Sequence, residues 1–148
     1  DSSVYALPSP NRVLLARRLA RHQRNALELA GFLSQKTEII YPGLSGHPAY
    51  FLCKENEFAG SFFNIKFKQG RDSVPKMKKF IKTVIKTAKR KQVNIVAGTS
   101  FGLNTTRIYL TSLFSKPSQP FLRVSVGTED FLELQKIKTV FKEVLNKF

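Results

Sequence analysis

Residues 123–129 (RVSVGTE) contain one arginine, and they are the stretch of the chain that most clearly suggests a binding site. Arg123 lies in a short segment whose other residues are largely apolar, and Gly127 and an acidic helix start follow it. An arginine held in a strand can face a pocket and bind a carboxylate through the planar fork of its guanidinium. The stretch therefore predicts a carboxylate-binding site. The same side chain could instead form a salt bridge with Glu129 or Asp130.

The size and composition of the chain indicate one folded domain. It has 148 residues, of which 42% are hydrophobic, and its 13 phenylalanines provide material for a core. The apolar runs are too short to cross a membrane, so no membrane partner is expected. The single cysteine, Cys53, cannot form an internal disulfide, which favours a reducing cytoplasm, and we interpret it as a half-buried packing residue. Because the chain lacks both an initiator methionine and a signal pattern, we expect a processed chain or a piece of a longer protein.

The positive charge of the chain allows a second interpretation. Twenty-five Lys and Arg against 10 Asp and Glu give a net charge of +15, which attracts nucleic acid, anionic membranes or an acidic partner. Basic helices over residues 11–33 and 74–91 could follow phosphates as a nucleic-acid-binding module. However, the aromatic residues are expected inside strands, and no nucleic-acid-binding motif is present. A basic domain separated from an acidic neighbour would carry the same charge, and nucleic acid is not the partner that we favour.

Three long amphipathic helices are predicted from apolar residues that recur at intervals of three and four. They span residues 11–33, 74–91 and 129–147. His22 lies within the apolar stripe of the first helix, and we expect it to be hydrogen-bonded and partly buried. Thr128 is expected to cap the last helix. The stripe of the first helix consists of Leu15, Leu19, His22, Ala26, Leu29 and Leu33.

Short strands are predicted between and after these helices, where apolar residues alternate or cluster. Together with the one-sided helices they indicate an α/β (α+β) fold, a two-layer sandwich in which an open, mostly antiparallel sheet carries helices on one face. Arg123 and Ser125 would then point to the free face of the sheet. Residues 1–10 are expected to form an extended leading segment, and residues 11–148 the domain. The predicted strands cover residues 37–41, 61–68, 93–97, 108–110 and 121–126, and a short helix covers residues 47–53.

Five stretches of the chain form a set of motifs, and they are Arg18-x-x-Arg21-His22-x-x-Asn25-Ala26, residues 41–48 (YPGLSGHP), residues 60–63 (GSFF), residues 100–102 (SFG) and residues 123–130 (RVSVGTED). In the same order they resemble motifs of the pyridoxal-phosphate (PLP) enzymes of cysteine and methionine metabolism, the cystathionine synthases and lyases and their relatives. The resemblance covers residues 11–148 and concerns the C-terminal domain of that family, the small domain of fold-type I PLP enzymes.

The resemblance implies roles for three residues. Arg123 would bind the α-carboxylate of an amino-acid substrate, and Ser100 would help to hold that carboxylate and the catalytic lysine. Thr99 occupies a position that differs between branches of the family, so it is a possible specificity position. Arg107 departs from the family pattern, in which a leucine is typical. We favour a partly exposed strand residue or a salt bridge for Arg107 over an anion contact.

The catalytic part of the family pattern is absent from this chain. In the family, PLP forms a Schiff base with a lysine in an S-x-T-K motif of the large domain, and no S-x-T-K occurs here. We therefore expect no catalytic residue, no bound PLP and no metal in this chain alone. The resemblance implies that the full-length enzyme is a cytoplasmic homo-oligomer in which the large PLP domain completes the site. Its reaction would be a γ-replacement, γ-elimination or β-elimination on a sulfur amino acid. A non-catalytic oligomerisation or regulatory domain derived from such an enzyme is the alternative.

Overall fold

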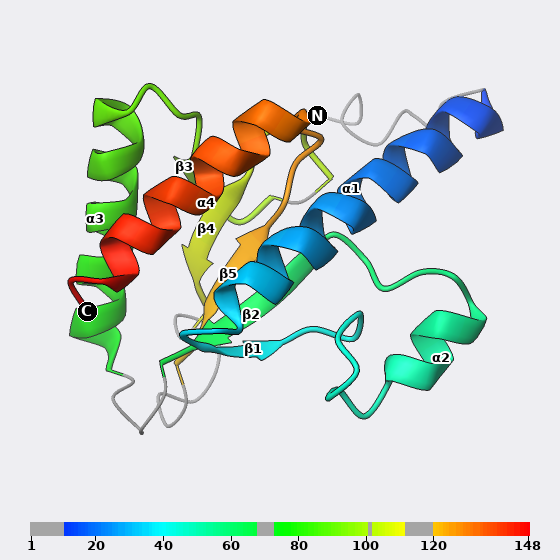
Figure 1. Cartoon of the computed structure of the whole chain (residues 1–148), viewed down its shortest axis with the longest axis horizontal. Helices are drawn as coiled ribbons and strands as arrows, with labels where there is room; N and C mark the ends of the chain where they lie inside the picture. Colours follow the sequence, from blue (N-terminus) through cyan, green and yellow to red (C-terminus); the bar gives the residue numbers. More distant parts are fainter. Residues whose placement is uncertain (1–10, 68–72, 101, 112–119) are drawn as a thin grey trace, which may run out of the picture.

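The computed structural model describes residues 11–67, 73–100, 102–111 and 120–148. The leading segment expected at residues 1–10 lies outside them. Four helices and five strands form the described part of the chain (Figure 1). In chain order they are α1 (Arg12–Leu33), β1 (Glu38–Ile40), α2 (Tyr50–Glu55), β2 (Phe62–Lys66), α3 (Val74–Arg90), β3 (Val96–Ala97), β4 (Arg107–Leu110), β5 (Leu122–Ser125) and α4 (Phe131–Leu145).

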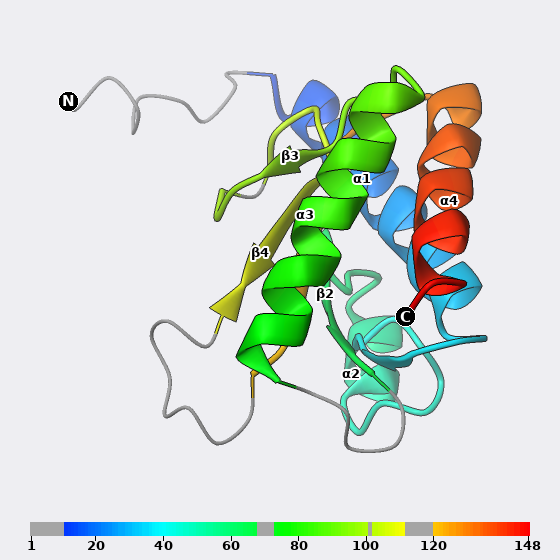
Figure 2. The same ribbon diagram turned by 90° about the vertical axis from the view of Figure 1, so that its left-hand side faces the viewer.

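The five strands make one open sheet in the order β1-β2-β5-β4-β3. All neighbouring strands are antiparallel except β3 and β4, which are parallel. The long helices α1, α3 and α4 lie on one side of the sheet, as Figures 1 and 2 show together. The predicted fold class, an open and mostly antiparallel sheet with helices on one face, is therefore confirmed.

The core lies between the sheet and these helices. Alternate strand residues point into it, because side chains along a strand face opposite sides of the sheet. The prediction of a buried strand over residues 93–97 is wrong in part. Val93 and Ile95 do enter the core, but the strand itself is only Val96–Ala97 at the edge of the sheet, and both of its residues are exposed. The fully buried strand residues are Phe63, Ile65, Ile108, Leu122 and Val124, each at most 1% exposed.

Helix α1 begins where the sequence predicts, but only its second half is buried. Asn11 is the N-cap, and its side-chain oxygen accepts hydrogen bonds from the amides of Val13 and Leu14. Leu15 and Leu19, expected in the buried stripe, are 37% and 39% exposed. A helix of 22 residues is about 33 Å long, whereas a strand of five residues spans about 17 Å. The first half of α1 therefore extends past the sheet (Figure 1).

The N-cap of helix α4 is Asp130, and the prediction of Thr128 is wrong. The Asp130 carboxylate accepts a hydrogen bond from the amide of Glu133. A carboxylate satisfies a free amide and also interacts favourably with the positive end of the helix. The hydroxyl of Thr128 instead bonds the side-chain oxygen of Asn104, so this residue is used to hold a neighbouring loop.

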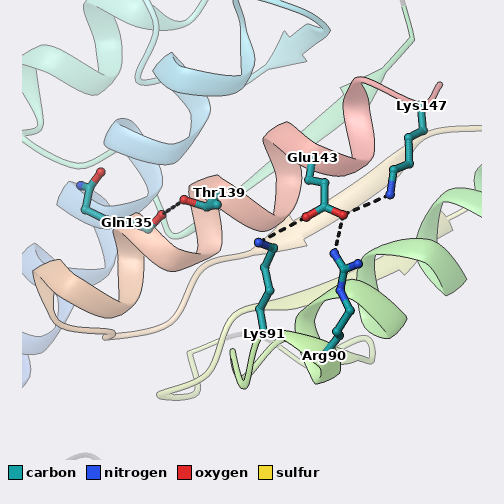
Figure 3. Close-up of polar contacts among 6 residues, drawn as sticks. All are labelled: Arg90, Lys91, Gln135, Thr139, Glu143 and Lys147. Carbon is teal, nitrogen blue, oxygen red and sulfur yellow. Dashed lines mark hydrogen bonds and ion pairs between the residues drawn. The ribbon is translucent and has the colours of Figure 1, made fainter.

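Glu143 joins the C-terminal ends of α3 and α4. Its carboxylate receives Lys147 at 3.0 Å, Arg90, and Lys91 at 3.3 Å (Figure 3). The hydrogen bonds from Lys147 and Arg90 lower the pKa of Glu143 to about 2. A carboxyl group whose pKa falls on folding contributes stability that is present above its ordinary pKa and is lost as the pH falls through the folded value.

We expect Glu143→Gln to lower the melting temperature modestly at pH 7. The difference from the wild type should shrink as the pH falls below 4.5 and should nearly disappear at pH 2, where the wild-type carboxylate also becomes protonated. Melting curves at pH 7, 4 and 2 measure this. Glu55→Gln, at an exposed glutamate outside the ion pairs of the described residues, is the control and should change little. A difference that stays constant down to pH 2 would contradict this account of Glu143.

Candidate functional site

Arg123 lies on the face of the sheet opposite the three long helices, which we call the open face. It is in β5, the central strand, and it pairs with Asn64 on β2 and Tyr109 on β4. The residues next along these strands, Val124 among them, are buried in the core. Because paired residues point to the same side of a sheet and successive residues to opposite sides, Asn64, Arg123 and Tyr109 form one row on the open face.

A second row on the open face lies beside the first. Ser125 follows Arg123 at the next outward position of β5, and it pairs with Phe62 on β2 and Arg107 on β4. Arg107 in turn pairs with Val96 on the edge strand β3. Arg107 and Arg123 are thus diagonal neighbours on adjacent strands, for which the separation of the α-carbons is roughly 7–8 Å.

The guanidinium of Arg123 is half-buried among these side chains. Its central carbon lies 5.9 Å from the centroid of the Phe62 ring, within the range of a cation–π contact. Its Nε is buried and has no hydrogen-bond partner. The side chain is therefore held at the sheet surface by an aromatic neighbour, while a hydrogen-bonding group of the fork is left without a protein partner.

The salt bridges that the sequence allows for Arg123 are not found in the described part of the chain. The carboxylate of Glu129 accepts a hydrogen bond from the amide of Thr106, and that of Asp130 caps helix α4. Within the strands, the one acidic residue is Glu38 on the edge strand β1, which stands opposite Lys66. Consequently the positive charge on the open face has no counterion among the ion pairs of the described residues.

Three of the five buried side-chain polar atoms that lack a hydrogen-bond partner among the described residues lie on this face. They are Nε of Arg123, Nε of Arg107 and Oδ1 of Asn64, and the other two are Nε2 of His22 and Oε2 of Glu129. A buried polar group that lacks a hydrogen bond costs free energy, so native proteins supply a partner for most of them. Their concentration on one side of the sheet indicates that a polar ligand or another polypeptide covers this surface.

Asn64, Arg107 and Tyr109 were not chosen as site residues from the sequence alone. Each occupies an outward position of a strand that alternates with buried residues, and this signal was available. What the sequence lacks is the register that brings the three strands together around Arg123.

Ser100 and Thr99 lie in the segment that follows β3, at the opposite edge of the sheet from β1, and both are exposed. Among the described residues, no hydrogen bond joins Ser100 to Arg123, and strand β4 lies between β3 and β5. Arg107, on the intervening strand β4, lies between the segment after β3 and Arg123. At Gly98 a Cβ atom would lie 2.8 Å from Nη1 of Arg107, so the guanidinium packs over the backbone just before Thr99.

One face of helix α1 holds the segments on either side of the site. Arg18 donates hydrogen bonds to the side chain of Asn104 at 2.7 Å and to the carbonyl of Gly102 at 2.8 Å. His22, only 2% exposed, donates from Nδ1 to the carbonyl of Val126 at 2.8 Å. The expectation of a hydrogen-bonded histidine is thus confirmed, and the ring is buried more deeply than the partial burial that the sequence predicts.

Asn25 continues the same face, since residues three and four apart are neighbours on a helix. Its amide nitrogen donates to the carbonyls of Gly127 at 3.2 Å and Glu129 at 2.9 Å. The spacing of Arg18, His22 and Asn25 therefore has a structural explanation. Arg18 fixes the loop after Ser100, while His22 and Asn25 fix the chain that leaves β5 after Arg123.

Gly127 allows the segment that follows β5 to contact the backbone of the loop at Asn104 and Thr105. A Cβ atom at this position would stand 2.1 Å from the carbonyl oxygen of Asn104 and 2.7 Å from the amide nitrogen of Thr105. The amide of Gly127 also donates to the hydroxyl of Thr106 at 3.2 Å. The glycine that ends the arginine strand is needed because another backbone occupies the place of a side chain.

Tyr41 connects two further motifs away from the open face. Its ring is buried, and its hydroxyl donates to the carbonyl of Gly60 at 2.9 Å, which joins the YPGL segment to the start of β2. Burial, with a smaller effect of Cys53, raises the pKa of Tyr41 to about 12. It therefore stays protonated and acts as a structural hydrogen-bond donor. Cys53 is partly buried, as expected.

The described ranges contain no group of three or more His, Cys, Asp or Glu side chains arranged to hold a metal ion. Among the helices in these ranges, none is both long and apolar enough to span a bilayer.

Comparison with known proteins places this geometry in a family. The model of the family described as "Cys/Met metabolism PLP-dependent enzyme" matches residues 13–141. The cystathionine gamma-lyase of Dictyostelium discoideum is 27% identical over 157 residues, and the bifunctional enzyme flvA of Aspergillus flavus is 25% identical over 145 residues. Among solved structures, the cystathionine gamma-lyase of Lactobacillus plantarum complexed with L-serine has a TM-score of 0.68 at 19% identity, a likeness in fold.

These similarities cover almost all of this chain but only part of each relative. They include 90% of this chain and 38% of the Dictyostelium enzyme, 95% of this chain and 16% of flvA, and 89% of this chain and 36% of the Lactobacillus enzyme. The chain thus spans less than two-fifths of the length of the relatives that it matches. Because the family model matches most of its residues, the chain belongs to the Cys/Met metabolism PLP-dependent enzyme family.

Proposed function

We propose that this chain is the C-terminal, substrate-carboxylate-binding domain of a PLP-dependent enzyme that acts on sulfur amino acids. The main support for the proposal is the environment of the Arg123 side chain. Its guanidinium is half-buried on the open face, its Nε has no partner, and no described residue neutralises it. A carboxylate with two oxygens in one plane is the ligand that best matches such a fork.

In this proposal Arg123 holds the α-carboxylate in a bidentate pair, and Phe62 keeps the guanidinium in place from one side. Ser100 supplies a further hydrogen bond from the segment after β3, and Thr99 beside it influences which substrate is accepted. The partly buried setting supports this role, since charge-assisted hydrogen bonds are stronger where water is excluded.

The residues of this chain do not fit the attachment of PLP itself. A lysine that forms a Schiff base needs a low pKa, which burial or neighbouring positive charge provides. None of the described lysines is buried. Lys66 lies at the margin of the sheet, Lys76 lies over the Phe67 ring, and Lys138 pairs with Glu28. We therefore assign no chemical step on the cofactor to this chain.

The cofactor would be supplied by a large domain that covers the open face. Two findings support this: the unpaired polar atoms on that face, and the share of the relatives' length that this chain leaves unmatched. We propose that the full-length enzyme is a cytoplasmic homo-oligomer with C–S lyase or γ-replacement activity. The similarity to an enzyme named cystathionine gamma-lyase supports the lyase alternative.

We expect that this chain, mixed with PLP and reduced with borohydride, will show scattered partial labelling of surface lysines. The reason is that none of the described lysines is fully buried, so no single lysine is set apart from the others by its surroundings. Peptide mapping by mass spectrometry measures the labelling, with an intact family member as the positive control. One stoichiometric adduct at a single lysine would contradict the proposal that the cofactor site lies elsewhere.

The role of Arg123 is tested by Arg123→Lys in the full-length enzyme. Lysine keeps the charge but loses the bidentate geometry. We expect KM for the amino-acid substrate to rise by roughly tenfold with a smaller change in kcat. Steady-state kinetics measure this, and the absorbance of the bound cofactor should stay unchanged. An unchanged KM would mean that Arg123 does not bind substrate through its fork.

A further inference from the structure

The exposed side of helix α3 carries a row of positive charges. Successive residues of an α-helix are rotated by about 100°, so five lysines of α3 fall within one quarter to one third of its circumference. All five are exposed, and the buried residues of α3 lie on the opposite side of the helix. Residues 73–100 contain no Asp or Glu. The five residues, which we call the lysine face, are Lys78, Lys79, Lys82, Lys86 and Lys89.

The lysine face has no counterion in the described part of the chain. The ion pairs found there use other lysines and Arg90. Like charges three or four residues apart destabilise a helix, and Lys78, Lys82 and Lys86 repeat that spacing. An anionic partner would relieve this repulsion, so the charge pattern points to such a partner.

The C-terminal end of α3 shows which anion its cations accept. Arg90 and Lys91 both bind the carboxylate of Glu143, with Lys91 at 3.3 Å (Figure 3). The hydrogen bonds from Lys147 and Arg90 lower the pKa of this carboxyl group to about 2. A carboxylate from a neighbouring element is thus already held by the cations that follow the lysine face.

The lysine face is long and narrow, which indicates a linear partner. The distance along the helix from Lys78 to Lys89 is about 17 Å, and the row is one helix wide. Helix α3 lies at the margin of the layer of helices (Figures 1 and 2). The flanking surfaces do not extend the row, because α4 bears Glu133 and Glu143 among its lysines and residues 92–97 are uncharged. A planar membrane would face these flanks as well, and the apolar side of α3 is buried where it cannot enter a bilayer.

Two features favour an acidic polypeptide over a nucleic acid as this linear partner. The exposed residues of α3 include no aromatic side chain on which bases could stack. A duplex is contacted by a helix that enters its major groove, about 12 Å wide. Helix α3 instead packs along α4 and is buried on its inner side, so it presents only one narrow strip.

The spacing of the lysines suits an extended polypeptide. Residues four apart on a helix have their β-carbons roughly 5–6 Å apart. Alternate residues of an extended chain are about 6.6–6.8 Å apart and point to the same side. Carboxylates at alternate positions of an extended segment can therefore meet successive lysines along α3, since the lysine side chains are long enough to take up the small difference.

We infer that the lysine face is a docking surface for an extended acidic polypeptide segment that carries carboxylates at alternate positions. The segment lies along α3, and its carboxylates pair with the lysines in the way that Glu143 pairs with Arg90 and Lys91. Because α3 covers the side of the sheet opposite the open face, this binding is separate from the proposed function.

The test uses a fluorescein-labelled peptide of twelve residues in which glutamate and serine alternate. The 148-residue chain is titrated into it at roughly 50 mM salt, where exposed charges are only partly screened, and fluorescence anisotropy is followed. We expect a Kd on the order of 0.1 mM. The same peptide with glutamine in place of glutamate should not bind.

The triple variant Lys78→Gln/Lys82→Gln/Lys86→Gln should weaken binding of the acidic peptide roughly tenfold. Glutamine has nearly the helix propensity of lysine, and a helical circular dichroism spectrum shows that the fold is kept. The variant Lys78→Arg/Lys82→Arg/Lys86→Arg should bind like the wild type, because the charges remain. Loss of binding in the arginine variant would overturn the inference.

The matched control is Arg12→Gln/Arg17→Gln/Arg24→Gln, which removes the same charge from exposed positions of α1. It should weaken binding of the acidic peptide by less than about threefold, since distant exposed charges are screened by salt. An equal loss in the two glutamine variants would attribute the binding to the general positive field of the chain. That result, or a wild-type chain that does not bind the peptide, would overturn the inference.

Two further probes separate the other possible partners. They are a short DNA strand with as many negative charges as the peptide, and vesicles that contain phosphatidylserine. We expect both to bind more weakly than the acidic peptide. Tighter binding of the DNA strand that is lost in the lysine-to-glutamine variant would assign the lysine face to nucleic acid. The same result with vesicles would assign it to a membrane, and either outcome would overturn the inference.

Discussion

Arg123→Ala in the full-length enzyme is expected to lower kcat/KM for the amino-acid substrate by roughly 30-fold to several thousand-fold. This range corresponds to the loss of a partly buried charge-assisted pair of about 2–5 kcal/mol. In our proposal the substitution also leaves the substrate carboxylate without its charged partner. Because Arg123 contacts the substrate and not the cofactor in our proposal, the absorbance spectrum of bound PLP should not change.

Steady-state kinetics of the alanine variant provide the measurement, and Lys82→Ala provides the control. Lys82 is an exposed lysine on helix α3, so its loss changes the net charge without touching the open face. Near-normal kcat/KM in Arg123→Ala would contradict the assignment. An equal loss in Lys82→Ala would attribute the effect to the general positive field of the chain.

Gly127→Ala is expected to destabilise the fold by about 3 kcal/mol. The new Cβ would meet the carbonyl oxygen of Asn104 at 2.1 Å and its carbonyl carbon at 2.5 Å. These are backbone atoms and cannot rotate away, so the segment after β5 must separate from the loop that Arg18 and Thr128 hold. Chemical denaturation measures the free energy of unfolding.

Gly46→Ala is the matched control for this change, because a Cβ at Gly46 has no atom within 4 Å. It should alter the free energy of unfolding by less than about 1 kcal/mol. If Gly127→Ala were as stable as Gly46→Ala, the close approach of the two backbones would not be a requirement of the fold. A stable Gly127→Ala variant with impaired substrate binding would show that the contact serves the site alone.

The parts of the fold that depend on local sequence could be predicted. Alternation of apolar and polar residues places β2 and the outward position of Arg123, and the helices that Asn11 and Ser73 cap begin within one residue of the predicted starts at positions 11 and 74. However, the periodicity of a helix does not show which of its turns contact the core. Leu15 and Leu19 continue the periodicity of α1 and are nevertheless exposed, since the sheet is shorter than the helix.

The candidate site was predicted only in part, because it depends on contacts between distant segments. Arg123 stands out by its position within one strand. Arg107 and Asn64 become its neighbours only through the pairing of β5 with β4 and β2, and a single strand does not encode that register. The local pattern predicts Thr128 as a helix cap, because its hydrogen bond to Asn104, 24 residues away in the chain, cannot be inferred from neighbouring residues.

The most direct test of the central claim is a crystal structure of the full-length enzyme with a bound amino-acid substrate or unreactive analogue. We predict that both oxygens of the α-carboxylate lie about 2.7–2.9 Å from the guanidinium nitrogens of Arg123. The Ser100 hydroxyl should lie within hydrogen-bond distance of the same carboxylate. A structure in which the carboxylate binds elsewhere, with Arg123 paired to a protein carboxylate, would contradict the account.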